Sequence, residues 1–141
     1  MVKFTANTRI MKAKIINIPK IEDPRGNLSV IEKEVVPFEI KRVYYLYDVP
    51  AGAERGGHSH KEQKEFLIAL SGSFDVILND GKVEKLVTLN KPFEGLLIIN
   101  GIWRELKNFS SGAVCLVVAS DVFEEADYIR DFEDFLAISA K

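Results

Sequence analysis

The chain has 141 residues, of which 47% are hydrophobic and 28% are charged. This length suits a single domain with a buried core, and the hydrophobic share excludes a disordered tail. The formal net charge of −2 argues against a broad basic face for nucleic acid, although a local group of arginines could still hold one or two phosphates.

The N-terminal region and the single cysteine indicate where the protein works. We expect residues 1–14 to form an N-terminal extension and residues 15–141 to form a single domain. No apolar run approaches the roughly 20 residues of a membrane span, and no secretory signal is recognisable. The lone cysteine, Cys115, lies in the apolar run AVCLVVAS, which predicts a buried thiol in a reducing compartment. We therefore expect a cytoplasmic protein that binds no membrane.

Short runs rich in β-branched and aromatic residues, separated by turn-forming residues, predict an all-β domain. The expected strands cover residues 42–49, 65–70, 74–78, 82–89, 95–99 and 113–120. The sequence Asn79-Asp80-Gly81 indicates a hairpin, because these residues tolerate the positive φ that tight turns need. Many short strands at this spacing favour a sandwich or a barrel.

The C-terminal segment EEADYIRDFEDFLAI has a different period. Its apolar residues recur at three- and four-residue steps, which is typical of one helical face. They are Tyr128, Ile129, Phe132, Phe135 and Leu136. We expect a short helix that packs on the sheet or on a partner subunit.

Both histidines of the chain, His58 and His60, stand in the stretch ERGGHSHKEQKEF. In an extended strand, residues i and i+2 point to the same face, so the two rings should lie together. With Glu65 they could form a metal site of two histidines and a carboxylate. The alternative is a pair of acid–base groups, since histidine titrates near neutral pH. A purely structural role is disfavoured, because two buried histidines would destabilise an apolar interior.

The spacing around the histidines resembles the first cupin motif. Every fixed position of that motif is matched, by Gly52, His58, His60, Glu65 and Gly72. The resemblance implies an all-β cupin barrel of the jelly-roll type with a short C-terminal helix. The site would lie inside the barrel.

The second cupin motif is matched in part, at Gly101 and Asn108. Ile99 stands where proline is usual, and Arg104 stands where the last metal-binding histidine would be. A guanidinium stays protonated and only donates hydrogen bonds, so Arg104 would repel a divalent cation. We therefore expect no metal and no other cofactor.

Longer segments resemble a narrower family. IKRVYYLYDV, RGGHSHK, GIWRELKNFSSG and ASDVFEEADYIRDFEDF are similar to the FdtA/QdtA-type (WxcM-like) cupins, over residues 15–136. The resemblance implies a sugar-nucleotide 3,4-ketoisomerase that converts dTDP-4-dehydro-6-deoxy-D-glucose to its 3-keto isomer. It also implies a role in 3-amino-sugar biosynthesis for surface glycans such as lipopolysaccharide O-antigen. A homodimer with exchanged N-terminal strands is expected, and DPRGN favours a galacto-type product.

Three residues are the catalytic candidates. Moving a ketone between neighbouring carbons needs a base of near-neutral pKa, so we assign His60 as the base and His58 to the sugar oxygens. Alternation places Tyr45 and Tyr47 on one strand face and Tyr44 on the other. The sequence does not decide which face lies inside, and two of the three tyrosines could simply pack. We choose Tyr45 as the one that orients a histidine.

Further residues are expected to bind substrate: Arg25, Arg42, Arg55, Glu65, Trp103 and Arg104. The first three arginines suit the diphosphate, because a guanidinium can form paired hydrogen bonds with phosphate oxygens. Trp103 would stack on sugar or thymine, or would instead pack at the mouth of the barrel. Glu65 would accept a hydrogen bond from a histidine, and Arg104 would stabilise an enediolate.

Three rival functions remain. A sugar-nucleotide 3,5-epimerase would remove a proton beside the same ketone. A metal-dependent cupin enzyme would lose activity to chelators. A non-catalytic cupin would bind the nucleotide sugar without changing it.

Overall fold

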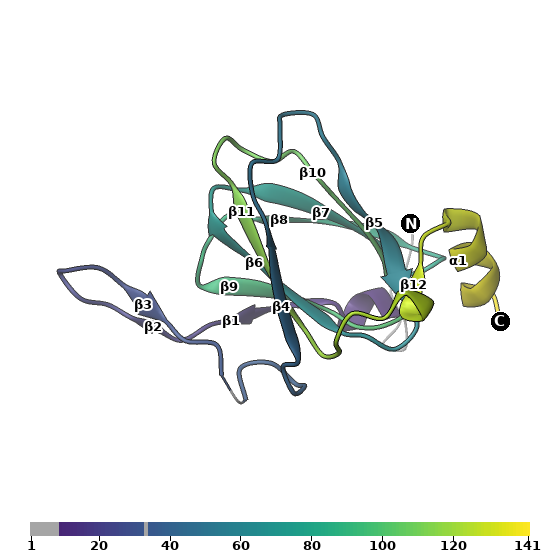
Figure 1. The fold of residues 1–141 in the computed structure, drawn as a ribbon, viewed down its shortest axis with the longest axis horizontal. Helices are drawn as coiled ribbons and strands as arrows, with labels where there is room; N and C mark the ends of the chain where they lie inside the picture. Colours follow the sequence, from purple (N-terminus) through teal and green to yellow (C-terminus); the bar gives the residue numbers. More distant parts are fainter. Residues whose placement is uncertain (1–8, 33) are drawn as a thin grey trace.

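The computed structural model describes residues 9–32 and 34–141, so residues 1–8 of the expected N-terminal extension lie outside the described residues. In the described part of the chain, two five-stranded antiparallel sheets face each other (Figure 1). The first sheet has the order β1-β9-β6-β11-β4. Its strands are Lys14–Asn17 (β1), Glu94–Ile98 (β9), Glu65–Ser71 (β6), Val114–Ala119 (β11) and Arg42–Leu46 (β4).

The second sheet has the order β12-β5-β10-β7-β8. Its strands are Tyr128–Ile129 (β12), Arg55–His60 (β5), Trp103–Lys107 (β10), Phe74–Asn79 (β7) and Glu84–Leu89 (β8). A two-stranded hairpin of Lys20–Ile21 (β2) and Leu28–Ser29 (β3) stands apart from both sheets. The helical elements are two 3₁₀ turns, Arg9–Lys12 (η1) and Glu125–Asp127 (η2), and the helix Phe132–Ser139 (α1).

The expected all-β architecture with a short C-terminal helix is confirmed. The helix itself is shorter than expected, because Tyr128 and Ile129 are extended and pair with His60 and Ser59 of β5. It begins only after Asp131, whose side chain accepts a 3.0 Å hydrogen bond from Asp134 N and so caps the helix. The apolar period of the sequence therefore spans a strand and a helix rather than one helix.

The main core lies between the two sheets. It includes Leu67 of β6, Val76 and Leu78 of β7, Leu96 of β9 and Val117 of β11, each at most 2% exposed. Apolar side chains point inward from alternate positions of both sheets, which is how facing antiparallel sheets bury a common core.

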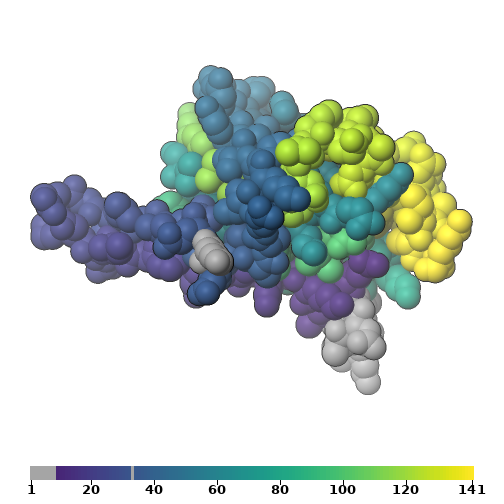
Figure 2. Space-filling model, turned by 60° about the horizontal axis from the view of Figure 1, so that its bottom comes forward, coloured from purple at the N-terminus to yellow at the C-terminus, as the bar shows by residue number. Residues whose placement is uncertain are grey.

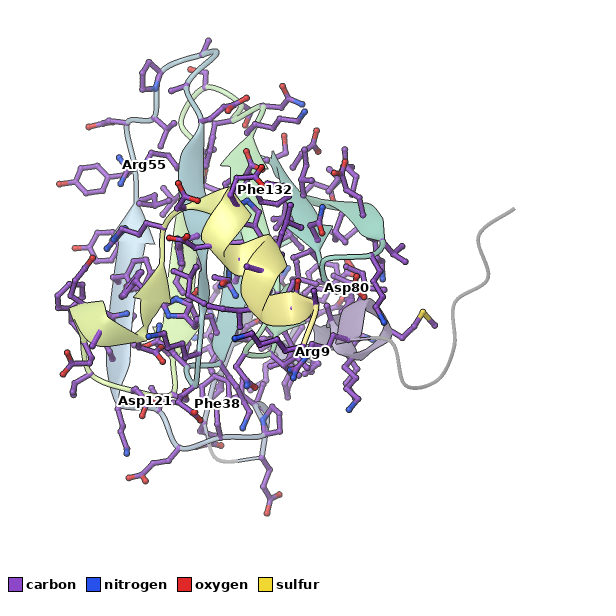
Figure 3. The ribbon with its side chains drawn as sticks, turned by 90° about the vertical axis from the view of Figure 1, so that its right-hand side faces the viewer. Arg9, Phe38, Arg55, Asp80, Asp121 and Phe132 are labelled. Atoms are coloured by element: carbon purple, nitrogen blue, oxygen red, sulfur yellow. The ribbon has the colours of Figure 1, made fainter. Side chains whose placement is uncertain are left out.

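Two smaller clusters cover the outer faces of the sheets. On the first sheet, Phe66 packs against Gly95, where an added Cβ would lie 2.0 Å from the Phe66 ring. On the second sheet, Trp103 and Ile129 pack against Phe135 of α1. Figure 3 looks onto α1, with Phe132 at the start of the helix. The helix therefore lies on the outside of the strand that carries both histidines.

The β2–β3 hairpin, with the turn between its strands, forms an arm that projects from the body of the molecule (Figures 1 and 2). Its apolar side chains Ile21 and Leu28 are 59% and 55% exposed. Of the described residues between 1 and 14, Ile10 and Ala13 are buried in the main core. Within residues 9–32 and 34–141, no helix has the length and apolar character needed to cross a membrane.

Candidate active site

A cavity of about 240 Å³ opens between the two sheets. Its polar lining consists of Arg42, Tyr44, Arg55, His58, Glu65, Arg104, Tyr128 and Arg130. Leu46, Leu67, Leu106 and Val117 supply the apolar part of the wall. A cavity with apolar walls and a few converging polar groups is the usual form of a small-molecule site.

Strand register brings a base and a cation together on one wall. Arg104 of β10 lies directly opposite His58 of β5, and both side chains line the cavity. The pairing shifts register between Arg104 and Leu106, and Gly56 adopts a φ of +77° there. A Cβ at Gly56 would lie 2.8 Å from Leu106, so this irregularity requires glycine.

Glu65 is the centre of a buried hydrogen-bond network. One carboxylate oxygen pairs with Arg104, and the other accepts hydrogen bonds from the Tyr44 hydroxyl at 2.7 Å and from Gln63 Nε2 at 3.0 Å. Burial alone would raise the pKa of Glu65, but the neighbouring His60 and the charge of Arg104 outweigh it and lower that pKa. Burial, reinforced by the charge of Glu65, raises the pKa of Tyr44 above its usual range. The carboxylate is therefore ionised and the phenol is neutral.

The two histidines occupy different depths. His58 lines the cavity and is 8% exposed, whereas His60 is fully buried behind it. Their Nε2 atoms lie 3.1 Å apart, and His60 Nδ1 lies 3.0 Å from Asp127 Oδ2. Burial, followed by the charge of Arg104, lowers the pKa of His58 to about 3. His58 is therefore neutral at neutral pH.

Arg42 supplies a cation at the cavity with part of its donor capacity free. Its Nη2 contacts Tyr128 Oη at 3.1 Å and Gln63 Oε1 at 3.4 Å. Its Nε is buried and has no hydrogen-bond partner among the described residues. A buried N–H without a partner is unfavourable, so this guanidinium is suited to an anionic ligand.

The same side chains fit a metal ion poorly. His58, His60 and Glu65 place one possible ligand atom each within 4.8 Å of one another. However, both Glu65 oxygens already accept hydrogen bonds. The positively charged guanidinium of Arg104 lies beside the same carboxylate, and it would repel a divalent cation bound there. We assign no step of the chemistry to a metal.

The structure brings five of the expected site residues to the cavity wall: Arg42, Arg55, His58, Glu65 and Arg104. His60 lies directly behind them. In Figure 3, Arg55 lies well away from Arg9 and Asp80, neither of which lines the cavity. The sequence therefore predicted most of the charged residues that line the cavity.

Three expected site residues lie elsewhere. Tyr45 is 60% exposed on the outer face of β4, and Tyr44 takes the inward position in its place. Trp103 neighbours the inward Arg104 on β10 and so points outward, where it packs under α1 and its Nε1 donates to Glu105. Arg25 lies on the projecting arm, with its side chain 90% exposed and paired with Asp23. Tyr45 and Trp103 therefore face away from the cavity of their own chain, and Arg25 does not reach it.

Sequence reasoning missed several functional neighbours, namely Tyr44, Gln63, Asp127, Tyr128 and Arg130. Asp127, Tyr128 and Arg130 lie in the segment read as helix, and its polar side chains were not considered for the site. The orientation of Trp103 could have been deduced, because consecutive strand residues face opposite sides. Nothing in the sequence alone marked Gln63.

Comparison with known proteins gives consistent matches. The family model described as FdtA, WxcM-like, C-terminal, matches residues 11–140. A curated TDP-4-oxo-6-deoxy-alpha-D-glucose-3,4-oxoisomerase from Aneurinibacillus thermoaerophilus is 44% identical over 93% of this chain and 95% of its own.

Two solved structures are similar over nearly the whole chain. The TDP-quinovose 3,4-ketoisomerase WlaRB from Campylobacter jejuni is 50% identical, covering 89% of this chain and 97% of its own, with a TM-score of 0.85. A histidine-to-asparagine mutant of the 3,4-ketoisomerase QdtA from Thermoanaerobacterium thermosaccharolyticum, in complex with TDP-4-keto-6-deoxyglucose, is 40% identical, covering 90% of this chain and 93% of its own, with a TM-score of 0.88. With its fold, the histidine pair beside its cavity and these matches, the chain belongs to the WxcM-like family of cupin-type sugar 3,4-ketoisomerases.

Proposed function

We propose that the chain is a dTDP-sugar 3,4-ketoisomerase that converts dTDP-4-dehydro-6-deoxy-D-glucose to the 3-keto isomer. The observation that carries the proposal is the pairing of His58 with Arg104 across β5 and β10, which places a neutral base beside a cation in one cavity. The relatives support the same reaction, and the Thermoanaerobacterium relative is a complex with TDP-4-keto-6-deoxyglucose.

The chemistry needs proton transfers and no external oxidant or reductant. The C3–H bond breaks, its proton passes to a base, and the C4 carbonyl becomes part of an enediolate. A proton then returns to C4, and the proton of O3 is transferred to O4, which leaves the ketone at C3 and a hydroxyl at C4. Such acid–base catalysis contributes on the order of 10²–10⁴-fold in rate.

We assign His58, rather than His60, as the base that meets the substrate. His58 lies on the cavity wall, whereas His60 has no exposed surface. A base must come within hydrogen-bond reach of the proton that it removes. This differs from the assignment that the sequence favoured, because sequence does not distinguish the depths of two residues on one strand face.

Arg104 is suited to stabilise the enediolate. It uses three of the five N–H donors of a guanidinium on Glu65 and the Ile102 carbonyl. The remaining donors stay fixed by these contacts, and fixed donors in a cavity of low dielectric stabilise developing negative charge most effectively.

The diphosphate is proposed to lie at the mouth of the cavity. Pockets that enclose a whole ligand measure roughly 300–1,000 Å³, so a cavity of about 240 Å³ suits the sugar rather than the whole nucleotide sugar. Arg42, Arg55 and Arg130 line this cavity and supply the cations that the phosphates need.

The configuration at C4 is a finer part of the proposal. The loop at residues 23–27 favours a galacto-type product, whereas the Campylobacter relative is named a TDP-quinovose 3,4-ketoisomerase, and quinovose is a gluco-type sugar. We give more weight to similarity along the whole chain, because the loop lies on the arm and not at the cavity of its own chain. We therefore propose the gluco-type product, with the galacto-type product as the alternative that the assay separates.

The projecting arm supports a homodimer with exchanged N-terminal strands. Ile21 and Leu28 on the arm are exposed, and so are Val43 and Tyr45 on β4, an edge strand of its sheet. Edge strands and apolar patches of this kind are suited to a second copy of the chain. In sedimentation velocity, Ile21→Asp with Leu28→Asp should give monomer, while the control Leu86→Asp should stay dimeric. A monomeric wild type would overturn this proposal.

We further propose a cytoplasmic enzyme whose product is consumed by an aminotransferase in the synthesis of 3-amino sugars for surface glycans. The free thiol of Cys115 is buried, which is compatible with a reducing compartment. The test offers a sugar-nucleotide aminotransferase both the product of this enzyme and its 4-keto substrate. Transfer of an amino group to C3 of the product, but not of the substrate, would support the pathway. Failure to use the product would contradict it.

The decisive experiment is a proton NMR time course with chelator-treated protein and dTDP-4-dehydro-6-deoxy-D-glucose. Appearance of a 3-keto sugar nucleotide would support metal-independent ketoisomerisation, and the C4 signal would give the configuration. Exchange at both C3 and C5 with solvent would instead indicate a 3,5-epimerase. Activity that returned only with added metal would contradict the role given to Arg104, and an unchanged substrate would indicate a binding protein.

A further inference from the structure

We propose that Asp127 is a positioning residue that fixes a proton on His60 Nδ1 and so converts the two histidines into a proton relay. In this relay His58 Nδ1 meets the substrate and His60 holds the proton between the two transfer steps. The inference rests on the proposed function for its catalytic meaning, although the protonation pattern can be measured without substrate.

Asp127 is held rigidly against His60. Its Oδ2 lies 3.0 Å from His60 Nδ1, and its two oxygens also accept hydrogen bonds from Glu62 N at 2.7 Å and Gln63 N at 3.2 Å. Backbone bonds from Lys61 N to Asp127 O, and from Asp127 N to Glu124 O, fix the segment from both sides. The carboxylate therefore cannot turn away from the ring.

An ionised carboxylate only accepts hydrogen bonds, so His60 Nδ1 must carry the proton that it shares with Asp127. In neutral imidazole the other nitrogen then has a lone pair. The Nε2 atom of His60 is accordingly an acceptor, and it faces His58 Nε2 at 3.1 Å and Gln63 Nε2 at 3.4 Å.

The protonation of His58 follows from the same contact. Two ring nitrogens at 3.1 Å form a hydrogen bond only if one of them donates, so His58 Nε2 carries its proton towards His60. The remaining nitrogen of His58, Nδ1, is then unprotonated on a ring that lines the cavity. Asp127 thus determines which atom of His58 is basic, although it does not touch the cavity itself.

The relay balances without any outside proton. As the C3–H bond breaks, its proton binds His58 Nδ1, and the Nε2 proton of His58 passes to His60 Nε2. His60 is then an imidazolium with Asp127 at 3.0 Å on one side and Glu65 at 3.6 Å on the other. When C4 is protonated, the same bonds form and break in reverse.

The charges around the pair explain why the proton should rest on His60. Burial, and after it the charge of Arg104, lowers the pKa of His58 and so disfavours charge on that ring. His60 instead has a carboxylate oxygen on each side, Asp127 Oδ2 at 3.0 Å from Nδ1 and Glu65 Oε1 at 3.6 Å from Nε2. The deeper ring is therefore the better place for a transferred proton.

The first test is the histidine ¹⁵N–¹H correlation spectrum of the full-length protein, which is simple because the chain has only two histidines. We expect His60 as the Nδ1–H tautomer and His58 as the Nε2–H tautomer at neutral pH. Variants His58→Asn and His60→Asn assign the signals. A wild-type spectrum in which neutral His60 carries its proton on Nε2 would overturn the proposal, whether or not any Asp127 variant folds.

The second test compares Asp127→Asn with Glu124→Gln. The asparagine is isosteric and can still accept one of the backbone N–H groups, but its amide no longer forces a proton onto His60 Nδ1. Glu124 caps η2 through Ala126 N and touches neither histidine, so it controls for local disturbance of the same turn.

For Asp127→Asn we expect kcat to fall by about tenfold or more, with KM unchanged and with a changed His60 tautomer. Glu124→Gln should leave both kcat and the histidine spectrum unchanged. Equal loss in both variants, or loss in Asp127→Asn with an unchanged tautomer, would reduce Asp127 to a structural residue. If the wild type does not isomerise the sugar while the tautomers are as expected, the proposed function fails but the protonation pattern stands.

Discussion

Arg104 and Glu65 form an ion pair that the protein encloses almost completely, with side-chain exposures of 1% and 2%. The pair joins β10 of one sheet to β6 of the other, so it links the two walls of the cavity. Tyr44 and Gln63 satisfy the other Glu65 oxygen. Charges this deep remain favourable only while each has its partner.

The first prediction concerns loss of this cation. Arg104→Met should lower kcat, since the enediolate loses its nearest positive group, and should lower the free energy of unfolding by about 3–5 kcal/mol. Urea denaturation and NMR assay of turnover measure the two effects. The double variant Arg104→Met with Glu65→Gln should regain much of the stability but not the activity. A double variant that is as active as the wild type would contradict the role of the guanidinium.

The second prediction separates base from fold. His58→Asn should reduce turnover by about 10²–10⁴-fold, because the only histidine on the cavity wall is lost. Circular dichroism should remain that of the wild type, and TDP-sugar binding by calorimetry should persist. Substantial turnover in His58→Asn would return the assignment of the base to His60.

The third prediction is a pH dependence of stability. The pKa of His58 is lowered from 6.5 to about 3, chiefly by burial and then by Arg104. Below pH 6.5 the unfolded chain therefore binds more protons than the folded one, and stability falls as the pH falls from about 6.5 towards 3. For one group the slope is at most about 1.4 kcal/mol per pH unit.

The ionisation of Glu65 also makes stability fall as the pH falls, but in a lower pH range. Its pKa is lowered from 4.5, so its contribution is present above about pH 4.5 and is lost on further acidification. Urea denaturation at a series of pH values measures the combined slope. The slope between pH 6.5 and 5 should flatten in His58→Asn, and an unchanged slope in that variant would exclude His58 as its source.

The fourth prediction concerns the diphosphate. Arg42→Met should weaken TDP binding by about 10- to 100-fold, since a hydrogen bond to a charged group contributes about 1.5–3 kcal/mol. Isothermal titration calorimetry with TDP measures this directly. The neighbouring exposed Lys41→Met removes the same charge outside the cavity and should bind TDP nearly as the wild type does. Equal weakening in both variants would indicate a general electrostatic effect.

The fifth prediction uses adjacent tyrosines as a matched pair. Tyr44→Phe removes the hydroxyl that donates to Glu65 and should lower kcat and stability, the latter by about 1 kcal/mol. Tyr45→Phe changes an exposed ring on the opposite face and should leave both unchanged. A larger effect at Tyr45 would mean that this face contributes to a site formed with a partner subunit.

The sequence was sufficient where a motif position marks the inward face. His58, Glu65 and Arg104 stand at the positions that carry the metal ligands in the cupin motifs, so the resemblance predicted that they face the interior of the barrel. The face of β4 could not be inferred in this way, because Tyr44, Tyr45 and their apolar neighbours are alike on both sides. Tyr45 is exposed at the edge of the sheet, a circumstance that depends on the order of strands rather than on local sequence.

The segment around Asp127 was misread for a related reason. A strand of two residues followed at once by a helix has the same apolar spacing as a longer helix. Only the pairing of Tyr128 with His60 reveals that Asp127 lies beside the buried ring. Long-range pairing of this kind has no signature within a single window of sequence.

The side chains that surround the proposed chemistry project largely from paired strands. His58 and Arg104 face each other across one ladder, and Tyr128 pairs with His60 in the next. Their relative positions are thus set by the backbone hydrogen bonds of the sheet rather than by the closing of a loop. Thermal inactivation should accordingly coincide with cooperative unfolding, and the enzyme should keep its active geometry up to the temperature at which the sheet itself melts.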